Sequence, residues 1–107
     1  MSQIQILLSD QGRTFEVNQG DEIFIRLEEN LGTGYQWNLQ QVDAAIVELL
    51  GTNFSPDYAP GIGGSGMQNF HFRTNASGHT KIQLRLKRPW ESANASIEHF
   101  TVGIQVK

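Results

Sequence analysis

The residues with the most chemical potential in this sequence are three histidines, and none has the companions that catalysis requires. The chain has 107 residues and no cysteine, which excludes thiol nucleophiles, disulfides and thiolate metal ligands. His71, His79 and His99 lack metal-ligand spacing, and the sequence identifies no carboxylate as a catalytic companion for them. No Gly-x-Ser-x-Gly motif is present, and no serine has a histidine partner that the sequence identifies. We therefore expect no catalytic residue and no metal site, and we interpret the histidines as ordinary surface residues that face solvent.

Two pairs of neighbouring carboxylates flank one expected strand. Asp21-Glu22 precedes this strand and Glu28-Glu29 follows it. A glycosidase would need two carboxyl groups that face one cleft, and nothing in the spacing indicates such a pair. We interpret all four as solvated charges that keep the strand ends soluble.

A glycine-rich segment formally matches the dinucleotide-binding pattern Gly-x-Gly-x-x-Gly. It reads Gly61-Ile62-Gly63-Gly64-Ser65-Gly66. That pattern has to follow a strand and open a helix, but Pro60 precedes it, and Met67 to Arg73 alternates as a strand. A kinase-type glycine loop would fit between two strands, but no Val-Ala-Ile-Lys motif or catalytic loop accompanies it. We expect no cofactor here.

Three segments have residue types that suit binding better than catalysis. They are Asn30-Leu31-Gly32-Thr33-Gly34-Tyr35, Gly61-Ile62-Gly63-Gly64 and Arg88-Pro89-Trp90. Glycine permits tight turns and lets the backbone approach a partner closely. Tryptophan and arginine are enriched at interface hot spots, and a proline presents its neighbours already ordered. We expect Trp90 at an interface and Tyr35 in a structural position with partial exposure.

The elements that must position these segments are strands, because apolar residues recur with a period of two. The inward-facing sets that we expect are Ile4, Ile6 and Leu8; Ile23, Ile25 and Leu27; Phe70 and Phe72; Ile82, Leu84 and Leu86; and Phe100, Val102, Ile104 and Val106. A further strand from Tyr35 to Gln40 carries Trp37, which we expect in the core. The stretch from Val42 to Leu50 fits a helical turn or a strand. Seven or eight short, mostly antiparallel strands favour an all-β, immunoglobulin-like β-sandwich or a closely related barrel.

Three connections stand out between these strands. They run from Glu28 to Gly34, from Gly51 to about Gly66, and from Arg88 to about Ser96. Long connections in compact domains are usually functional or disordered, and alternate connections of a sandwich lie at the same end. We expect the three to converge on one surface of a single domain that spans residues 1–107.

Composition limits the partners and the compartment. The formal net charge is −3 and the basic residues are scattered, so we expect no nucleic-acid partner. No stretch reaches the roughly 20 apolar residues of a membrane span. Residues 1–8 lack the basic start and cleavage site of a signal peptide. This favours a cytoplasmic protein unless a leader was removed.

The three segments, in their order and strand context, resemble the chagasin family of inhibitors of papain-like cysteine proteases. That family carries an Asn-Pro-Thr-Thr-Gly-Tyr-x-Trp loop, a Gly-x-Gly-Gly loop and an Arg-Pro-aromatic loop on an immunoglobulin-like fold. The match spans about Asp21 to Val106. It implies a reversible, competitive inhibitor of cathepsin L-like enzymes, without cofactor or enzymatic activity. We expect a monomer, which is the default for an inhibitor of this size. Residues 30–35 would cover the catalytic centre, and residues 61–64 and 88–90 would grip the cleft walls.

The first loop departs from the family pattern at two positions. Leu31 replaces the proline and Gly32 replaces the first threonine. Both changes widen the conformational range of an unbound loop, so we expect them to lower affinity. Leu31 could instead fill an apolar subsite of the enzyme.

Two other readings use the same sandwich. An adhesion or carbohydrate-binding module would use Trp90 as a stacking platform. An assembly domain would pair its edge strands with neighbours, although we expect outward charges at Arg85, Lys87 and Lys107 to oppose edge pairing.

Overall fold

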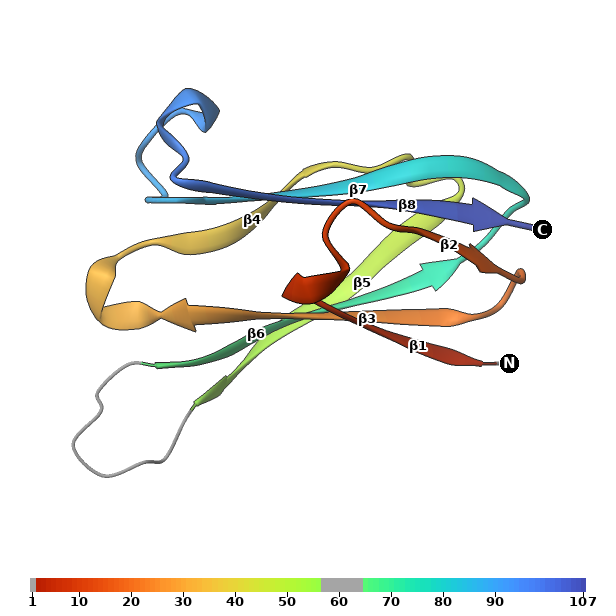
Figure 1. Ribbon diagram of the computed structural model, residues 1–107, viewed down its shortest axis with the longest axis horizontal. Helices are drawn as coiled ribbons and strands as arrows, with labels where there is room; N and C mark the ends of the chain where they lie inside the picture. Colours follow the sequence, from red (N-terminus) through yellow and green to blue (C-terminus); the bar gives the residue numbers. More distant parts are fainter. Residues whose placement is uncertain (1, 57–64) are drawn as a thin grey trace.

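A computed structural model describes residues 2–56 and 65–107, and these residues form two packed four-stranded sheets (Figure 1). The elements in chain order are β1 (Gln3–Leu7), η1 (Leu8–Asp10), β2 (Thr14–Val17), β3 (Glu22–Asn30), η2 (Leu31–Thr33), β4 (Gln36–Gln41), β5 (Val47–Pro56), β6 (Ser65–Thr74), β7 (Gly78–Lys87), η3 (Ala93–Ala95) and β8 (Glu98–Val106). The three η segments are short 3-10 turns. The predicted all-β sandwich is confirmed, with eight strands in the described residues.

The strand order is β1-β3-β6-β5 in the first sheet and β2-β8-β7-β4 in the second. β1 runs parallel to β3, and β2 runs parallel to β8. The other four pairings within the described ranges are antiparallel. The first two strands therefore belong to different sheets, and η1 crosses from one to the other.

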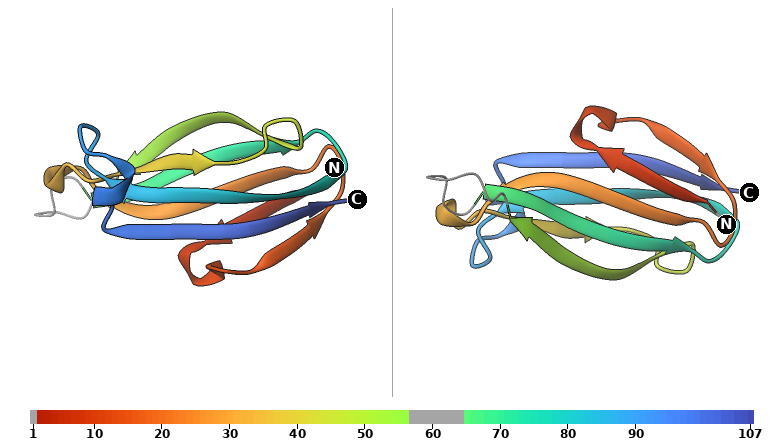
Figure 2. Two further views of the ribbon diagram at one scale, coloured as in Figure 1. Left: turned by 90° about the horizontal axis from the view of Figure 1, so that it is seen from above. Right: turned by 90° about the horizontal axis from the view of Figure 1, so that it is seen from below.

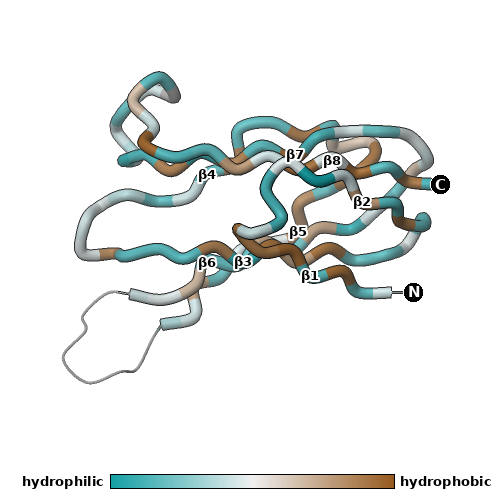
Figure 3. Tube along the Cα trace, viewed as in Figure 1, coloured by the Kyte–Doolittle hydropathy of each residue, from teal (hydrophilic) through white to brown (hydrophobic). Residues whose placement is uncertain are grey.

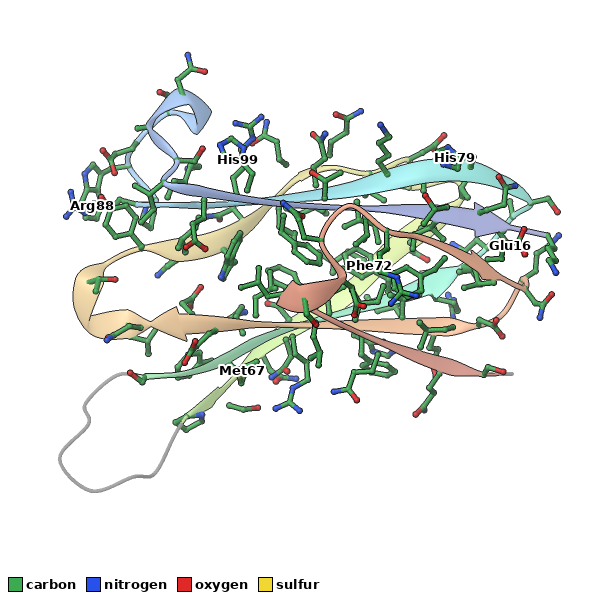
Figure 4. All side chains as sticks on the ribbon, in the orientation of Figure 1. Glu16, Met67, Phe72, His79, Arg88 and His99 are labelled. Carbon is green, nitrogen blue, oxygen red and sulfur yellow. The ribbon has the colours of Figure 1, made fainter. Side chains whose placement is uncertain are left out.

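The core lies between the sheets and follows the predicted alternation. Phe72 is fully buried there (Figure 4), and hydrophobic residues recur along the strands of both sheets (Figure 3). Buried core side chains are Ile6, Val17, Ile23, Ile25, Leu27, Trp37, Val47, Phe70, Phe72, Ile82, Leu84, Phe100, Val102, Ile104 and Val106. Trp37 is 5% exposed, as expected. Burial of apolar surface on this scale is the main force that holds two sheets together.

Leu8 contradicts the predicted alternation of the first strand. β1 ends at Leu7, whose backbone N–H donates to Asp10 Oδ2 over 3.0 Å. The chain then turns through η1 toward the second sheet, which leaves Leu8 49% exposed instead of buried.

The stretch from Val42 to Leu50 contains both of the structures that its sequence allows. Asp43 O accepts hydrogen bonds from Ile46 N and Val47 N over 3.0 and 2.9 Å, which closes one helix-like turn. β5 begins directly afterwards at Val47, which is buried.

The expected second connection is shorter than Gly51 to Gly66. β5 continues to Pro56 and β6 begins at Ser65, because the two strands pair as far as Pro56 opposite Gly66. Gly51 lies at an irregularity of this ladder, opposite His71. Gly66 is a packing glycine, since a Cβ there would collide with the Ser55 carbonyl oxygen.

Two other expectations about strand ends are corrected. β3 extends to Asn30, so Glu28 and Glu29 belong to the strand and not to the connection. Arg85 and Lys87 lie on β7, and Lys107 directly follows β8; both strands are central in their sheet, so these charges cannot guard an edge.

The molecule is elongated, with extents of 45 × 31 × 22 Å. The β3–β4 and β7–β8 connections lie at the same end of the sandwich, and the C-terminus and the start of β1 lie at the other (Figure 2). Within the described residues, no helix has the length and apolar character needed to cross a membrane.

Candidate functional site

The β3–β4 connection is a short loop that its own side chains hold in shape. Asn30 Oδ1 accepts a hydrogen bond from Gly32 N over 2.9 Å, and Thr33 Oγ1 donates to Asn30 O over 2.8 Å. Gly34 N donates to Leu31 O over 3.2 Å, and the φ angle of Gly34 is 79°. That left-handed conformation costs glycine little but strains other residues. The loop is thus preformed despite its lack of proline.

The tip of this loop faces solvent. Leu31 is 49% exposed, and Gly32 and Thr33 are also exposed. Tyr35 is half-buried, as expected, and its N–H donates to Thr33 Oγ1 over 3.2 Å. An exposed leucine on a fixed turn is a feature that a binding partner can bury.

Glu29 anchors the base of the loop from inside the sandwich. Its Oε1 accepts a hydrogen bond from Trp37 N over 2.7 Å, and Trp37 Nε1 donates to Glu28 O over 3.0 Å. Burial raises the pKa of the Glu29 carboxyl above its usual range, and the hydrogen bond from Trp37 partly opposes this effect. The two bonds tie the end of β3 to the start of β4.

The sequence reading of Glu29 as a solvated charge was wrong, because its side chain is only 6% exposed. The signal that could have found it is the alternation itself. Ile23, Ile25 and Leu27 point inward, so the next inward position of β3 is 29.

The β7–β8 connection packs against this loop. Gln36 pairs with Lys87 across β4 and β7, so the two connections start side by side. The Arg88 guanidinium lies 4.6 Å from the centre of the Tyr35 ring, a cation–π arrangement. The Trp90 ring passes close to Gly34, so that a Cβ added there would lie 3.7 Å from its Cη2.

Trp90 is the most exposed large apolar residue among those described, at 75%. It follows Arg88 and the exposed Pro89 at the end of the sandwich, where Figure 4 labels Arg88. Lys87 holds the segment, since its Nζ donates to Glu91 O over 3.0 Å and to Arg88 O over 3.5 Å. Sequence reasoning named Lys87 only as an outward charge, because nothing in its spacing indicates contacts with the backbone of the next residues.

The predicted second segment, Gly61-Ile62-Gly63-Gly64, lies outside the described residues. Its flanks do not: Ser65 pairs with Asn30, and Pro56 pairs with Gly66. The start of β6 is therefore next to the first loop. The expected strand follows this segment and begins at Ser65, two residues before Met67, where a dinucleotide-binding motif would need a helix.

The histidines have different surroundings. His79 and His99 are exposed, as expected. His71 is half-buried, stacks on Phe24 with ring centres 4.4 Å apart, and has its Nε2 2.9 Å from Glu22 Oε1. Its carboxylate partner lies 49 residues away in the chain, so the sequence could not show it. Within the described ranges, no group of acidic or histidine side chains could hold a metal ion.

A family model for the chagasin family of peptidase inhibitors, I42, matches residues 16–104 of the chain. The chain belongs to the chagasin family. The predicted resemblance is confirmed, and with it the expectation of a cysteine protease inhibitor that is not an enzyme.

Curated relatives have similar lengths. Chagasin from Trypanosoma cruzi is 26% identical over 106 residues, which cover 94% of this chain and 96% of the relative. Amoebiasin-2 from Entamoeba histolytica is 24% identical over 95 residues, which cover 88% of this chain and 77% of the relative.

Solved structures share the fold. The cysteine protease inhibitor EhICP2 from Entamoeba histolytica superposes with a TM-score of 0.90 at 22% identity, over 100% of this chain and 97% of the other. The structure of PbICP-C in complex with falcipain-2 gives a TM-score of 0.69 at 17% identity, over 98% of this chain and 89% of the other.

Proposed function

We propose that residues 1–107 act as one inhibitor domain that blocks the active-site cleft of papain-like cysteine proteases with the loop end of the sandwich. Residues 30–35 enter the cleft and cover the catalytic residues. Residues 88–90 grip one wall, and residues 61–64 grip the other. The inhibition is non-covalent, reversible and competitive.

The observation that carries this proposal is the packing of the first and third loops into one projecting edge. Arg88 lies over Tyr35, and Trp90 lies beside Gly34. Each loop orders the other before a partner arrives, which lowers the entropic cost of binding. The solved complex of PbICP-C with falcipain-2, a papain-like cysteine protease, supports this class of target.

Leu31 gives the edge an apolar tip in the place of the family's proline. Because it is 49% exposed and lies on a turn that Asn30 fixes, it can enter an apolar subsite without reordering of the loop. We therefore propose that the Leu31 side chain increases affinity for the protease. The flexibility argument from the sequence predicts the opposite, namely that the loss of proline at this position lowers affinity.

The test is a titration against papain and a cathepsin L-like enzyme, with cleavage of a fluorogenic peptide as the readout. Competitive inhibition is expected, and Leu31→Ala should raise the inhibition constant about tenfold, since a buried leucine side chain contributes roughly 1.5–3 kcal/mol. Leu50→Ala is the matched control, because Leu50 is 41% exposed on β5, away from the loops. Equal inhibition by both variants would contradict the proposed edge, and non-competitive kinetics would contradict cleft occlusion.

A further inference from the structure

The outer face of the β1-β3-β6-β5 sheet carries a groove that the inhibitory edge does not use. It has a volume of about 480 Å³. The lining residues come from all four strands and are Gln3, Gln5, Phe24, Arg26, Asn53, Ser55 and Asn69. They lie on the solvent side because Ile4, Ile6, Ile23 and Ile25 of the same strands point to the core. Met67, labelled in Figure 4, marks this outer side of the sheet.

Among the described residues that line the groove, Arg26 is the only charged one, and a hydrogen-bond network fixes its position. Its Nε donates to Asn69 Oδ1 over 2.9 Å. Asn69 is held in turn, since its Nδ2 donates to Asn53 Oδ1 over 2.8 Å and to Ser55 Oγ over 2.9 Å. The guanidinium is therefore oriented by a polar side chain that spans β6 and β5.

The Arg26 charge is unpaired within the described part of the chain. The other basic groups on this face have acidic partners: Arg73 lies 3.6 Å from Glu48, and His71 lies 2.9 Å from Glu22. No carboxylate of the described residues lies within ion-pair distance of Arg26, and its terminal nitrogens have no hydrogen-bond acceptor there. Arg26 as a residue is half-buried, and a guanidinium with two free terminal nitrogens is suited to bidentate binding of a carboxylate.

The rest of the lining is neutral and suits hydroxyl groups. Gln3 and Gln5 lie on β1, with Gln5 directly opposite Phe24. Their amides offer donors and acceptors on one side of the groove, and the amide of Asn53 does so on the opposite side, because β1 and β5 are the edge strands of this sheet. The Phe24 ring stacks on His71 with an angle of 10° between the rings, which fixes its orientation and leaves one ring face for a ligand. An aromatic ring beside amides can pack against the C–H face of a pyranose.

We propose that this groove binds a sugar that carries a carboxylate, such as a hexuronate residue of an acidic glycan. The carboxylate pairs with the Arg26 guanidinium, the hydroxyls bond to the amides of Gln3 and Gln5, and the C–H face covers Phe24. One positive charge among neutral amides matches one anionic group per sugar and does not match a densely charged polyanion. The site is independent of the loop edge, so a bound glycan leaves the inhibitory surface free.

The test is NMR titration of the 15N-labelled protein with methyl galacturonoside and methyl glucuronoside, followed on the side-chain amides of Asn53, Asn69, Gln3 and Gln5. Saturable shifts at these groups are expected for at least one epimer at millimolar concentration. The corresponding neutral methyl glycoside should bind at least about tenfold more weakly, because it lacks the charge-assisted pair. Acetate should give no saturable shift below the concentration at which the uronoside saturates.

Arg26→Gln should abolish the shifts, and Arg73→Gln is the matched control, because Arg73 is a cation of the same sheet face that does not line the groove. Phe24→Leu should weaken binding several-fold while keeping apolar volume. Four outcomes would overturn the proposal. Both epimers could give no saturable shifts, or acetate could give an equal response. Arg26→Gln could still bind, or the shifts could be confined to residues 30–35 and 88–90. All variants should inhibit papain like the unchanged protein, so failure here does not depend on the proposed inhibitory function.

Discussion

The two ends of strand β3 each carry a buried carboxyl group, and the pKa values of these two groups shift in opposite directions. Each end has one buried carboxyl group that binds backbone N–H groups, namely Asp21 just before the strand and Glu29 near its end. Asp21 accepts hydrogen bonds from Asn18 N and Ser2 N, each over 2.9 Å, and these two bonds lower the pKa of its carboxyl. Glu29 accepts one such bond, and burial raises its pKa.

The surroundings of the two carboxyl groups also differ: those of Asp21 are held by hydrogen bonds within the chain, and those of Glu29 include exposed apolar side chains. At the Asp21 end, Thr74 Oγ1 donates to Asn18 O over 2.7 Å and to Asp21 O over 3.0 Å, so the turn is tied to β6. At the Glu29 end, the connections leave Leu31 and Trp90 exposed. The first end satisfies its polar groups within the chain, whereas the second presents apolar surface that only a partner can cover.

Trp90→Ala should produce the largest effect, and this effect should be on inhibition and not on stability. Truncation of an exposed interface anchor removes roughly 2–4 kcal/mol of binding, so the inhibition constant should rise about thirtyfold or more. The free energy of unfolding should stay within about 0.5 kcal/mol of the unchanged protein, since surface substitutions seldom cost more. Enzyme titration and urea denaturation measure the two effects, and a large loss of stability would show that Trp90 supports the fold instead.

Thr74→Val should give the reverse pattern at the other end. Valine keeps the shape of this buried side chain, which is 1% exposed, but removes the donor to Asn18 O and Asp21 O. Loss of the hydroxyl should lower the free energy of unfolding by about 1–3 kcal/mol. Inhibition should be unchanged at temperatures where the variant is folded, and weaker inhibition would mean that the two ends are coupled.

The smallest and most specific effect is on the pH dependence of stability. The lowered pKa of Asp21 means that its contribution is complete above its unfolded pKa, about 3.9, and is lost as pH falls through its folded pKa. The raised pKa of Glu29 has the opposite sign, because the folded state takes up its proton first and stability from this group rises as pH falls.

Urea denaturation of Asp21→Asn and Glu29→Gln between about pH 7 and pH 3 separates the two carboxyl groups. The stability difference between the unchanged protein and Asp21→Asn should shrink on acidification. The free energy of unfolding of Glu29→Gln should rise relative to that of the unchanged protein at neutral pH, and this difference should disappear in acid. Two pH profiles with the same slope would contradict the assignment.

The sequence predicted the strands wherever side chains alternate without interruption. Phe70 and Phe72, or Val102 and Ile104, occupy the inward positions that the period of two requires. Trp37 was predicted in the core for the same reason. Local patterns suffice for these residues because each strand buries one face.

The failures arose where a contact joins distant parts of the chain. Leu8 departs from the alternation because the chain crosses from one sheet to the other there. Gly51 was predicted in a connection, but it lies in β5 and pairs with His71 on β6, and this pairing is not visible in the local sequence. Asp21 was read as solvated, although Ser2 and Asn18 cover it. The loop residues 30–35 and 88–90 were predicted from a family resemblance, but the cation–π contact between Arg88 and Tyr35 was not visible in either segment alone.

The position of β8 in its sheet also determines when the molecule can fold. β8 contains residues 98–106 and lies between β2 and β7. Residues 14–17 pair with β8, so they cannot form this pairing before β8 has been synthesised. During synthesis, β2 and β7 therefore have no neighbour on that side until residues 98–106 have left the ribosome. Such non-local pairing makes folding slow, so the second sheet is complete only after β8 has been synthesised. Until then, its unpaired strands are the part of the chain most prone to aggregate.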